Sequence, residues 1–231
     1  MTPEDDEGPP GFTGLDGERP IHRYTRRLPH WRQDGATYWV TFRQDDALDQ
    51  QTQENLRILR RTWEQLYPPP RTEEQWNAYA HEYTSLAERW LDRGYGSCVF
   101  RDRRWADQLS DALRYRQDEW YYLGASVVMP NHVHLLVRPF PGRKLERLLQ
   151  YWKSHIARKL NHERGTPGQQ LWMEESYDRI VRDVAHLDKA LQYLGRNPTH
   201  AGLEHEKGWR RWIAPEWREA DWVFEDENAE M

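Results

Sequence analysis

Two histidines separated by one residue are the side chains of this sequence best suited to holding a metal ion. His132 and His134 lie within residues 130–137, a Pro-Asn turn followed by the run His-Val-His-Leu-Leu-Val that predicts a strand. Alternate residues of a strand point to the same face, so both imidazoles face one way and Val133 faces the core. Imidazole suits transition metals, and oxygen ligands or water could complete a site for Mg or Mn. Taken alone, the pair is more typical of two polar residues on a half-exposed strand than of a metal site.

A second group lies on a predicted helix, residues 184–197, which Pro198 is expected to end. Helical periodicity places Tyr193 and Asn197 about 40° apart, one turn from each other. A phenol there could act as a nucleophile and a carboxamide could supply an oxygen ligand to an ion. An isolated tyrosine is more often a half-buried aromatic beside the core. Tyr151 and Tyr177 are rival nucleophiles, but neither has a ligand-type residue one turn away in a comparable motif.

Hydrophobic periodicity predicts the elements that position these residues. Strands are expected at residues 36–42, 120–129, 132–137 and 177–182, and helices at 103–115, 144–162 and 184–197. The two middle strands are too close for a crossover helix, so they form an antiparallel hairpin. Residues 45–98 predict a helical insertion without an obvious catalytic group, either a structural or a DNA-contacting addition. The order of elements indicates an α+β domain on an antiparallel sheet.

Charge is distributed unevenly along the chain, whose formal net charge is −5. Residues 1–18 carry six acidic residues and no Lys or Arg, and residues 216–231 carry seven acidic residues and one Arg. Residues 19–215 therefore carry a net charge of +7, from 25 acidic and 32 basic residues. A basic body suits a polyanionic ligand, although ordinary solvated surface explains the charge equally well. The basic residues expected to contact DNA are Arg23, Arg26, Arg27, Arg103, Arg104, Lys153, Arg158 and Lys159.

Composition also sets the domain limits and the compartment. Residues 1–20 predict a disordered acidic leader, residues 21–215 a single domain that includes the insertion, and residues 216–231 an acidic tail. Cys98 is the single cysteine, so no internal disulfide and no Cys-x-x-Cys zinc site is expected. The N-terminus lacks the layout of a signal peptide, and no apolar run is long enough for a membrane span. We therefore expect a cytoplasmic protein that does not interact with membranes.

Several stretches together resemble the REP-associated tyrosine transposases. That family is related to the single-tyrosine insertion-sequence transposases of the HUH nuclease superfamily. The matching stretches are residues 27–31, 38–43, 128–137, 152–154, 171–183, 193–198 and 201–203. No single stretch is specific to the family, but the ordered set of stretches over about residues 20–204 is specific to it. The sequence departs from the family's motifs at Leu194, at Thr199 and within residues 172–178.

The resemblance implies a fold, a mechanism and a substrate. The implied fold is ferredoxin-like, with an antiparallel sheet and helices on one face. His132, His134 and Asn197 match the family's metal ligands, for Mg or Mn, and Tyr193 matches its nucleophile. The implied reaction cleaves and rejoins single-stranded DNA beside REP-like hairpins through a 5′-phosphotyrosine intermediate. Family members are monomers or homodimers, so either state is expected.

Two other functions remain open at this stage. A domesticated relative could bind hairpin DNA without turnover, although the complete set of His132, His134, Tyr193 and Asn197 speaks against decay. A metal-dependent phosphoesterase could use the histidine pair and an activated water, and it would form no covalent adduct. A histidine-triad nucleotide hydrolase is disfavoured, because Leu136 stands where a third alternating histidine would be needed.

Overall fold

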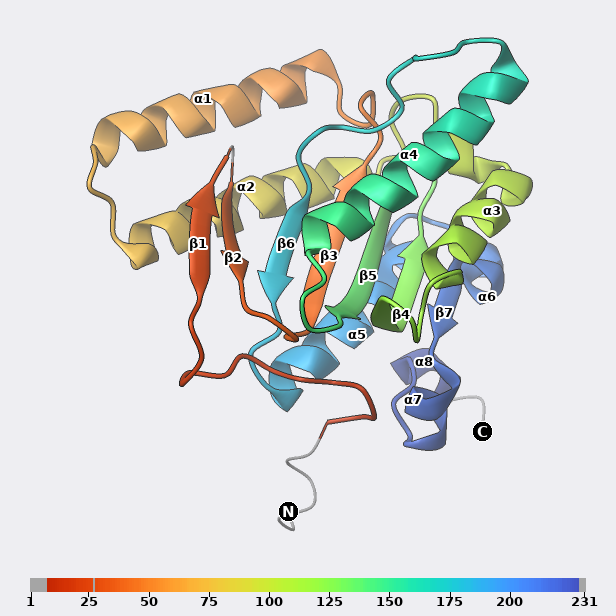
Figure 1. Ribbon diagram of the computed structural model, residues 1–231. Coiled ribbons are helices and arrows are strands. Elements are labelled where there is room, and N and C mark those ends of the chain that lie inside the picture. The colour runs from red at the N-terminus through yellow and green to blue at the C-terminus, as the bar shows by residue number, and fades with distance from the viewer. Residues whose placement is uncertain (1–7, 27, 229–231) are drawn as a thin grey trace.

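A five-stranded antiparallel sheet forms the centre of the protein (Figure 1). The computed structural model describes residues 8–26 and 28–228. The strands run in the order β6-β3-β5-β4-β7, and every neighbouring pair is antiparallel. They are β3 (Tyr38–Arg43), β4 (Tyr121–Val128), β5 (His132–Pro139), β6 (Tyr177–Ile180) and β7 (Arg211–Ile213). A separate hairpin pairs β1 (His22–Thr25) with β2 (Pro29–Arg32). The α+β class and the β4–β5 hairpin predicted from the sequence are confirmed.

Five long helices and several short ones surround the sheet. The long ones are α1 (Gln50–Leu66), α2 (Glu73–Leu91), α3 (Arg103–Arg114), α4 (Leu145–Arg164) and α5 (Val184–His200). The short ones are η2 (Val99–Arg101), η3 (Glu204–Glu206), α6 (Lys207–Arg210), α7 (Pro215–Glu219) and α8 (Glu225–Asn228). Helices α1 and α2 form the insertion, and α2 begins with a capping box between Thr72 and Gln75. No helix within the described residues is long and apolar enough to cross a membrane.

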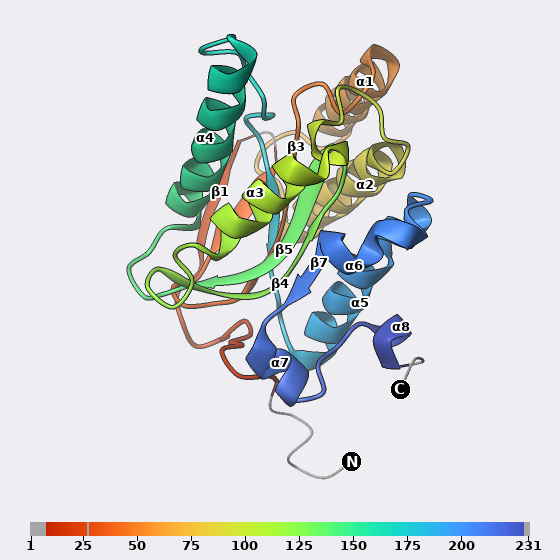
Figure 2. The ribbon, with the colours of Figure 1, turned by 90° about the vertical axis from the view of Figure 1, so that its right-hand side faces the viewer.

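Helices cover both faces of the sheet, which corrects the expectation of helices on one face (Figure 2). Val40, Val133 and Leu135 pack with α3 and α4 on one face. Leu136 and Val127 pack with α5 on the other. The physical reason is that β4 and β5 are buried on both sides, so each side needs its own covering layer. The insertion helix α2 lies on the same side of the sheet as α5 (Figure 2).

Helix α5 continues through Pro198 to His200, so the expectation that Pro198 ends it is wrong. A proline so close to the C-terminal end removes only one helical hydrogen bond. The backbone N–H of Ala201 donates to the carbonyl of Asn197 and closes the last turn. Asn197 therefore lies within a helix rather than at its frayed end.

The segments before and after the domain pack against it. Leu15 N–H donates to the carbonyl of Val181, and the indole N–H of Trp217 donates to the carbonyl of Pro10 at 2.8 Å. Both Trp217 and Phe224 are buried. These contacts correct the expected disordered leader over residues 8–20, and they hold part of the acidic tail, residues 216–228, against the domain. The rest of both segments, residues 1–7 and 229–231, lies outside the described residues.

Gly124 lies at an irregularity in the β4–β5 pairing, where Trp217 packs against the strand. A Cβ added at Gly124 would come within 2.2 Å of the Trp217 ring, which is itself buried. We expect Gly124→Ala to lower the free energy of unfolding by about 1–3 kcal/mol, because the indole has to shift. Urea unfolding measures this difference. Gly208→Ala is the matched control, since its Cβ would meet no atom within 4 Å; an equal loss in both variants would contradict the packing argument.

Candidate active site

His132 and His134 lie side by side on β5, with Val133 in the core of the opposite face. Their ring centroids are 4.8 Å apart and their planes are nearly perpendicular, at 85°. His132 and His134 are both buried, each with only 1% of its surface exposed. The two imidazoles therefore form a buried pair rather than two polar side chains on an exposed strand.

Hydrogen bonds to Nδ1 orient both rings. His134 Nδ1 lies 2.7 Å from Thr41 Oγ1 on the neighbouring strand β3, and His132 Nδ1 lies 2.8 Å from Asn131 Oδ1. The Asn131 amide nitrogen donates to the carbonyl of Tyr95, which fixes Oδ1 as the atom facing His132. His132 Nδ1 is then the donor, and its Nε2 keeps a free lone pair. Outer partners of this kind commonly orient metal-binding histidines.

Both histidines are neutral at physiological pH. Burial lowers the pKa of His132 well below the ordinary value, and the neighbouring His134 lowers it further. Burial also lowers the pKa of His134, to about 3. Contact with the Asn197 side chain opposes the shift in both rings. Neutral imidazole is the form that binds a cation.

Helix α5 brings Asn197 to the histidine pair. Its amide nitrogen donates to the backbone carbonyl of Tyr193 at 2.8 Å, which turns Oδ1 away from that carbonyl. Asn197 Oδ1 and His132 Nε2 are buried without a hydrogen-bond partner among the described residues. Leaving a buried acceptor unsatisfied costs about 1–3 kcal/mol. A cation would satisfy both lone pairs at once, so these residues fit a divalent metal ion.

Tyr193 packs between Trp39 and the histidine pair. Its ring centroid lies 5.0 Å from that of Trp39 and 5.4 Å from that of His134. Burial, and after it the negative charges of Glu88 and Asp92, raise the pKa of Tyr193 above its usual value. The phenol keeps its proton at neutral pH, so it would need help to act as a nucleophile.

The two rival tyrosines lie elsewhere. Tyr177 on β6 is paired with Thr41 and lines a small pocket together with Thr84 of α2. Tyr151 on α4 packs against Trp120 in the core of the opposite face. Of the three tyrosines, Tyr193 is the one whose ring packs against His134.

The sequence did not reveal three polar residues that affect this cluster. Asn131 precedes His132 directly, so its adjacency was the available signal. Thr41 meets His134 through the register of β3 with β5, which no local pattern encodes. Glu88 lies on α2, in the insertion expected to lack an obvious catalytic group, and after burial its negative charge is the next cause that raises the pKa of Tyr193.

The expected DNA-contacting residues lie in two separate places. Arg103, Arg104, Arg158 and Lys159 lie on α3 and α4, where Arg104 pairs with Glu163. Arg23 pairs with Glu73 and lies over the Trp31 ring. Lys153 donates to the carbonyls of Met173 and Glu174, and burial lowers its pKa to about 8. Arg26 lines two neighbouring cavities, one of them shared with Lys153, and Arg27 lies outside the described residues.

A buried ionic network lines the cavity that Arg26 and Lys153 share. His30 lies 2.8 Å from Asp178 and 2.7 Å from Glu175. Arg32 pairs with the same Asp178 and with Glu146. Burial alone would lower the pKa of His30, but hydrogen bonds to the two carboxylates outweigh it and raise the pKa to about 9.

This network predicts a stability that depends on pH. Because the pKa of His30 is higher in the folded than in the unfolded state, the stabilisation is complete below about pH 6.5 and disappears as the pH rises through 9. We expect the free energy of unfolding to fall between pH 7 and pH 9.5, and to fall less in His30→Gln. Urea unfolding across this range measures both slopes. If the free energy of unfolding falls equally with pH in the wild type and in His30→Gln, a group other than His30 causes the pH dependence.

Comparison with known proteins finds a family match over part of the chain that includes the site residues. Residues 95–197 match the family model described as "Transposase IS200 like". Over this segment the chain is similar to the IS200-like transposases, and the resemblance to single-tyrosine transposases expected from the sequence is confirmed at this level. The matched segment contains His132, His134, Tyr193 and Asn197. No curated protein matches the chain.

One solved structure is described as a REP-associated tyrosine transposase bound to a REP hairpin. It is 14% identical, with a TM-score of 0.42, and the match covers 80% of this chain and 76% of that one.

Proposed function

We propose that this protein is a metal-dependent single-stranded DNA endonuclease and transposase that uses Tyr193 as its nucleophile. One observation carries the proposal. Buried, unpartnered polar atoms of His132 and Asn197 lie beside a half-buried phenol, in a segment that matches the IS200-like transposase family model. A phosphoesterase that uses an activated water would have no need for the phenol.

The chain's own residues have distinct parts in the proposed reaction. His132 Nε2, Asn197 Oδ1 and the Nε2 of His134 would hold a divalent ion, Mg or Mn, which supplies Lewis-acid stabilisation of charge on the scissile phosphate. Tyr193 Oη attacks phosphorus and loses its proton, and the bond from phosphorus to the 3′ oxygen breaks. The products are a 5′-phosphotyrosine and a 3′ hydroxyl, which takes up a proton. Attack by a 3′ hydroxyl reverses these steps and rejoins the strand.

A basic groove beside the β1–β2 hairpin is the proposed contact surface for the DNA backbone. The groove extends to the start of α4, and Lys and Arg there would bind phosphates and position the strand. Its basic side chains outside the buried ionic network are Arg19, Arg26, Arg143, Lys144 and Arg147. The proposed substrate is a single strand carrying a hairpin, as the family resemblance implies.

The test is incubation with labelled single-stranded hairpin oligonucleotides in the presence of Mg or Mn. We expect a DNA–protein adduct that survives a denaturing gel, together with a released fragment that ends in a 3′ hydroxyl. Cleavage without an adduct would support the phosphoesterase instead. Hairpin binding without either product, across hairpins from the flanking genome, would support a protein that only binds DNA.

A further inference from the structure

Alternate residues of strand β3 form a row beside the candidate active site. Trp39, Thr41 and Arg43 point to the same face of the sheet, because side chains alternate along a strand. The first member, Trp39, has its ring centroid 5.0 Å from that of Tyr193. The second member contacts the histidine pair, since Thr41 Oγ1 lies 2.7 Å from His134 Nδ1. Arg43 is the third member, and it brings a guanidinium to the same row.

The register of β3 with β5 places Arg43 beside a proposed metal ligand. In this pairing Thr41 lies opposite His134. Two residues later, Arg43 lies opposite His132. Directly opposed residues of an antiparallel pair share a face of the sheet, with Cβ atoms about 4.5–5.5 Å apart. The hydrogen bond of the first pair demonstrates this proximity, and at the second pair the side chain of Arg43 leaves the sheet next to His132.

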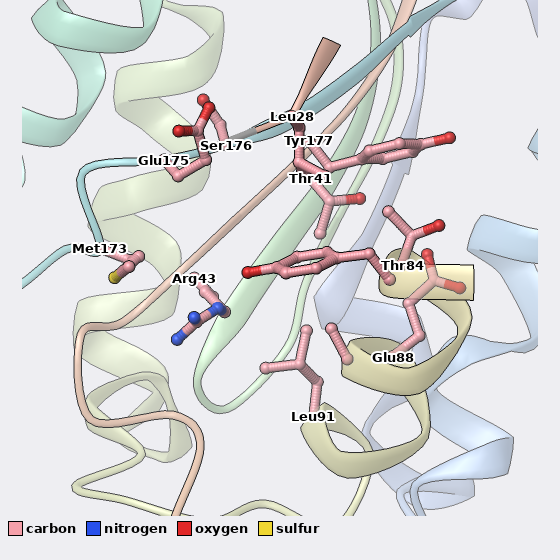
Figure 3. Close-up of a pocket in the computed structure, with 12 residues that line it drawn as sticks. Leu28, Thr41, Arg43, Thr84, Glu88, Leu91, Met173, Glu175, Ser176 and Tyr177 are labelled. Atoms are coloured by element: carbon pink, nitrogen blue, oxygen red, sulfur yellow. The ribbon is translucent and has the colours of Figure 1, made fainter. Parts of the chain in front are cut away.

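A small pocket between α2 and the sheet is lined by both Thr41 and Arg43 (Figure 3). Its charged lining groups besides the half-buried guanidinium are the carboxyl groups of Glu88 and Glu175. Glu175 is engaged by His30 at 2.7 Å, and burial raises the pKa of Glu88 to about 7. These carboxyl groups therefore offset the positive charge of Arg43 only in part.

A guanidinium next to a metal site is suited to a phosphodiester. Arginine has five N–H donors in a planar fork, and two of them can bind two oxygens of one phosphate. In Arg43 one donor is directed at the carbonyl of Gln44, at 3.4 Å, and the fork can serve more than one acceptor at a time. Donors aimed at a phosphoryl group that gains charge during attack stabilise the transition state more than the bound substrate.

We propose that Arg43 is a catalytic residue, whose guanidinium donates to a non-bridging oxygen of the scissile phosphate when that phosphate is held at the ion beside His132. The proposal rests on the proposed function, which places the ion at His132 and the attacking oxygen on Tyr193. The ion and the guanidinium then share the negative charge of the phosphoryl group. Strand β3 thereby orients one metal ligand through Thr41 and binds the substrate through Arg43.

Single-turnover adduct formation with a saturating hairpin oligonucleotide and Mn tests this role. Removing one preorganised donor to a developing anion costs about 100- to 1,000-fold in rate, and we expect a loss of this size in Arg43→Ala. Arg43→Lys keeps the charge without the planar fork, so it should recover part of the rate. Added guanidinium ion should also restore part of the rate to Arg43→Ala. Arg61→Ala, at an exposed position of α1, is the matched control and should react like wild type.

A second readout needs no cleavage. In the Tyr193→Phe background, anisotropy measures the affinity for the same oligonucleotide with and without Mn. A phosphate held by the ion and the guanidinium together makes binding tighter with Mn, and Arg43→Ala should lose most of that gain. Mn affinity in the absence of DNA should not fall, because Arg43 is not a ligand. Should Arg43→Ala fail to fold, Arg43→Met replaces it, since it keeps much of the aliphatic stem and removes the charge.

Three results would overturn the assignment of Arg43. The first is a wild-type adduct rate in Arg43→Ala, and the second is a full Mn-dependent gain in DNA affinity in that variant. The third is an equal loss of Mn affinity without DNA in a folded variant, because Arg43 would then hold the metal site together rather than bind phosphate.

The two readouts also separate this inference from the function on which it rests. If the wild type forms no adduct, yet shows a Mn-dependent gain in DNA affinity that Arg43→Ala loses, the tyrosine chemistry is refuted and phosphate binding by Arg43 stands. If the wild type forms the adduct and Arg43→Ala equals it in rate and in affinity gain, the role of Arg43 alone is refuted.

Discussion

Tyr193→Phe is expected to abolish the covalent DNA adduct and leave hairpin binding within about twofold of wild type. The substitution removes the attacking oxygen, and loss of a catalytic nucleophile lowers turnover by more than about a thousandfold. The phenylalanine ring retains the packing of Tyr193 between Trp39 and His134. A labelled hairpin oligonucleotide on a denaturing gel measures the adduct, and a filter-binding or anisotropy titration measures the affinity.

The rival tyrosines provide matched controls for this result. Tyr177→Phe loses a hydroxyl on β6, and Tyr151→Phe loses a hydroxyl on the far face of the sheet. Both variants should still form the adduct. An adduct that persists in Tyr193→Phe and disappears in Tyr177→Phe would assign the nucleophile to β6, the strand next to the one that carries Thr41.

Local patterns explain why much of the site was predictable. The alternation of a strand places His132 and His134 on one face, and the helical repeat places Tyr193 and Asn197 one turn apart. Each pattern needs only a few consecutive residues. Bringing the strand and the helix together needs tertiary packing, and the resemblance to a known family supplied that step.

The unpredicted features depend on contacts between distant parts of the chain. Thr41 and His134 are joined by strand register, and Glu88, far from Tyr193 in the sequence, contributes to the raised pKa of Tyr193 through its charge. An acidic, Pro- and Gly-rich segment predicts disorder, but Leu15 and Trp217 anchor the described parts of the leader and tail. In the tail, Asp226 pairs with Arg211 and Lys207, so the tail neutralises part of the basic body.

His132→Ala is expected to abolish metal-dependent adduct formation together with the stabilisation that Mn gives the folded protein. An ion that binds only the folded state raises the melting temperature, and removing a ligand removes that increment. Calorimetric titration with Mn and thermal melting with and without it measure the two effects. His162→Ala, at an exposed position on α4, is the control and should retain both. If His132→Ala still binds Mn and forms the adduct, the ion binds elsewhere.

The same site predicts an unusual pH dependence of metal binding. An ordinary histidine pair loses affinity below about pH 6.5, because protons compete with the cation for the ring nitrogen. Burial lowers the pKa of His132 well below that value and the pKa of His134 to about 3, so competition begins only at much lower pH. We expect the Mn affinity to change by less than about twofold between pH 7.5 and pH 5.5. A tenfold fall over that range would mean that the rings are solvated, and would argue against a buried metal centre.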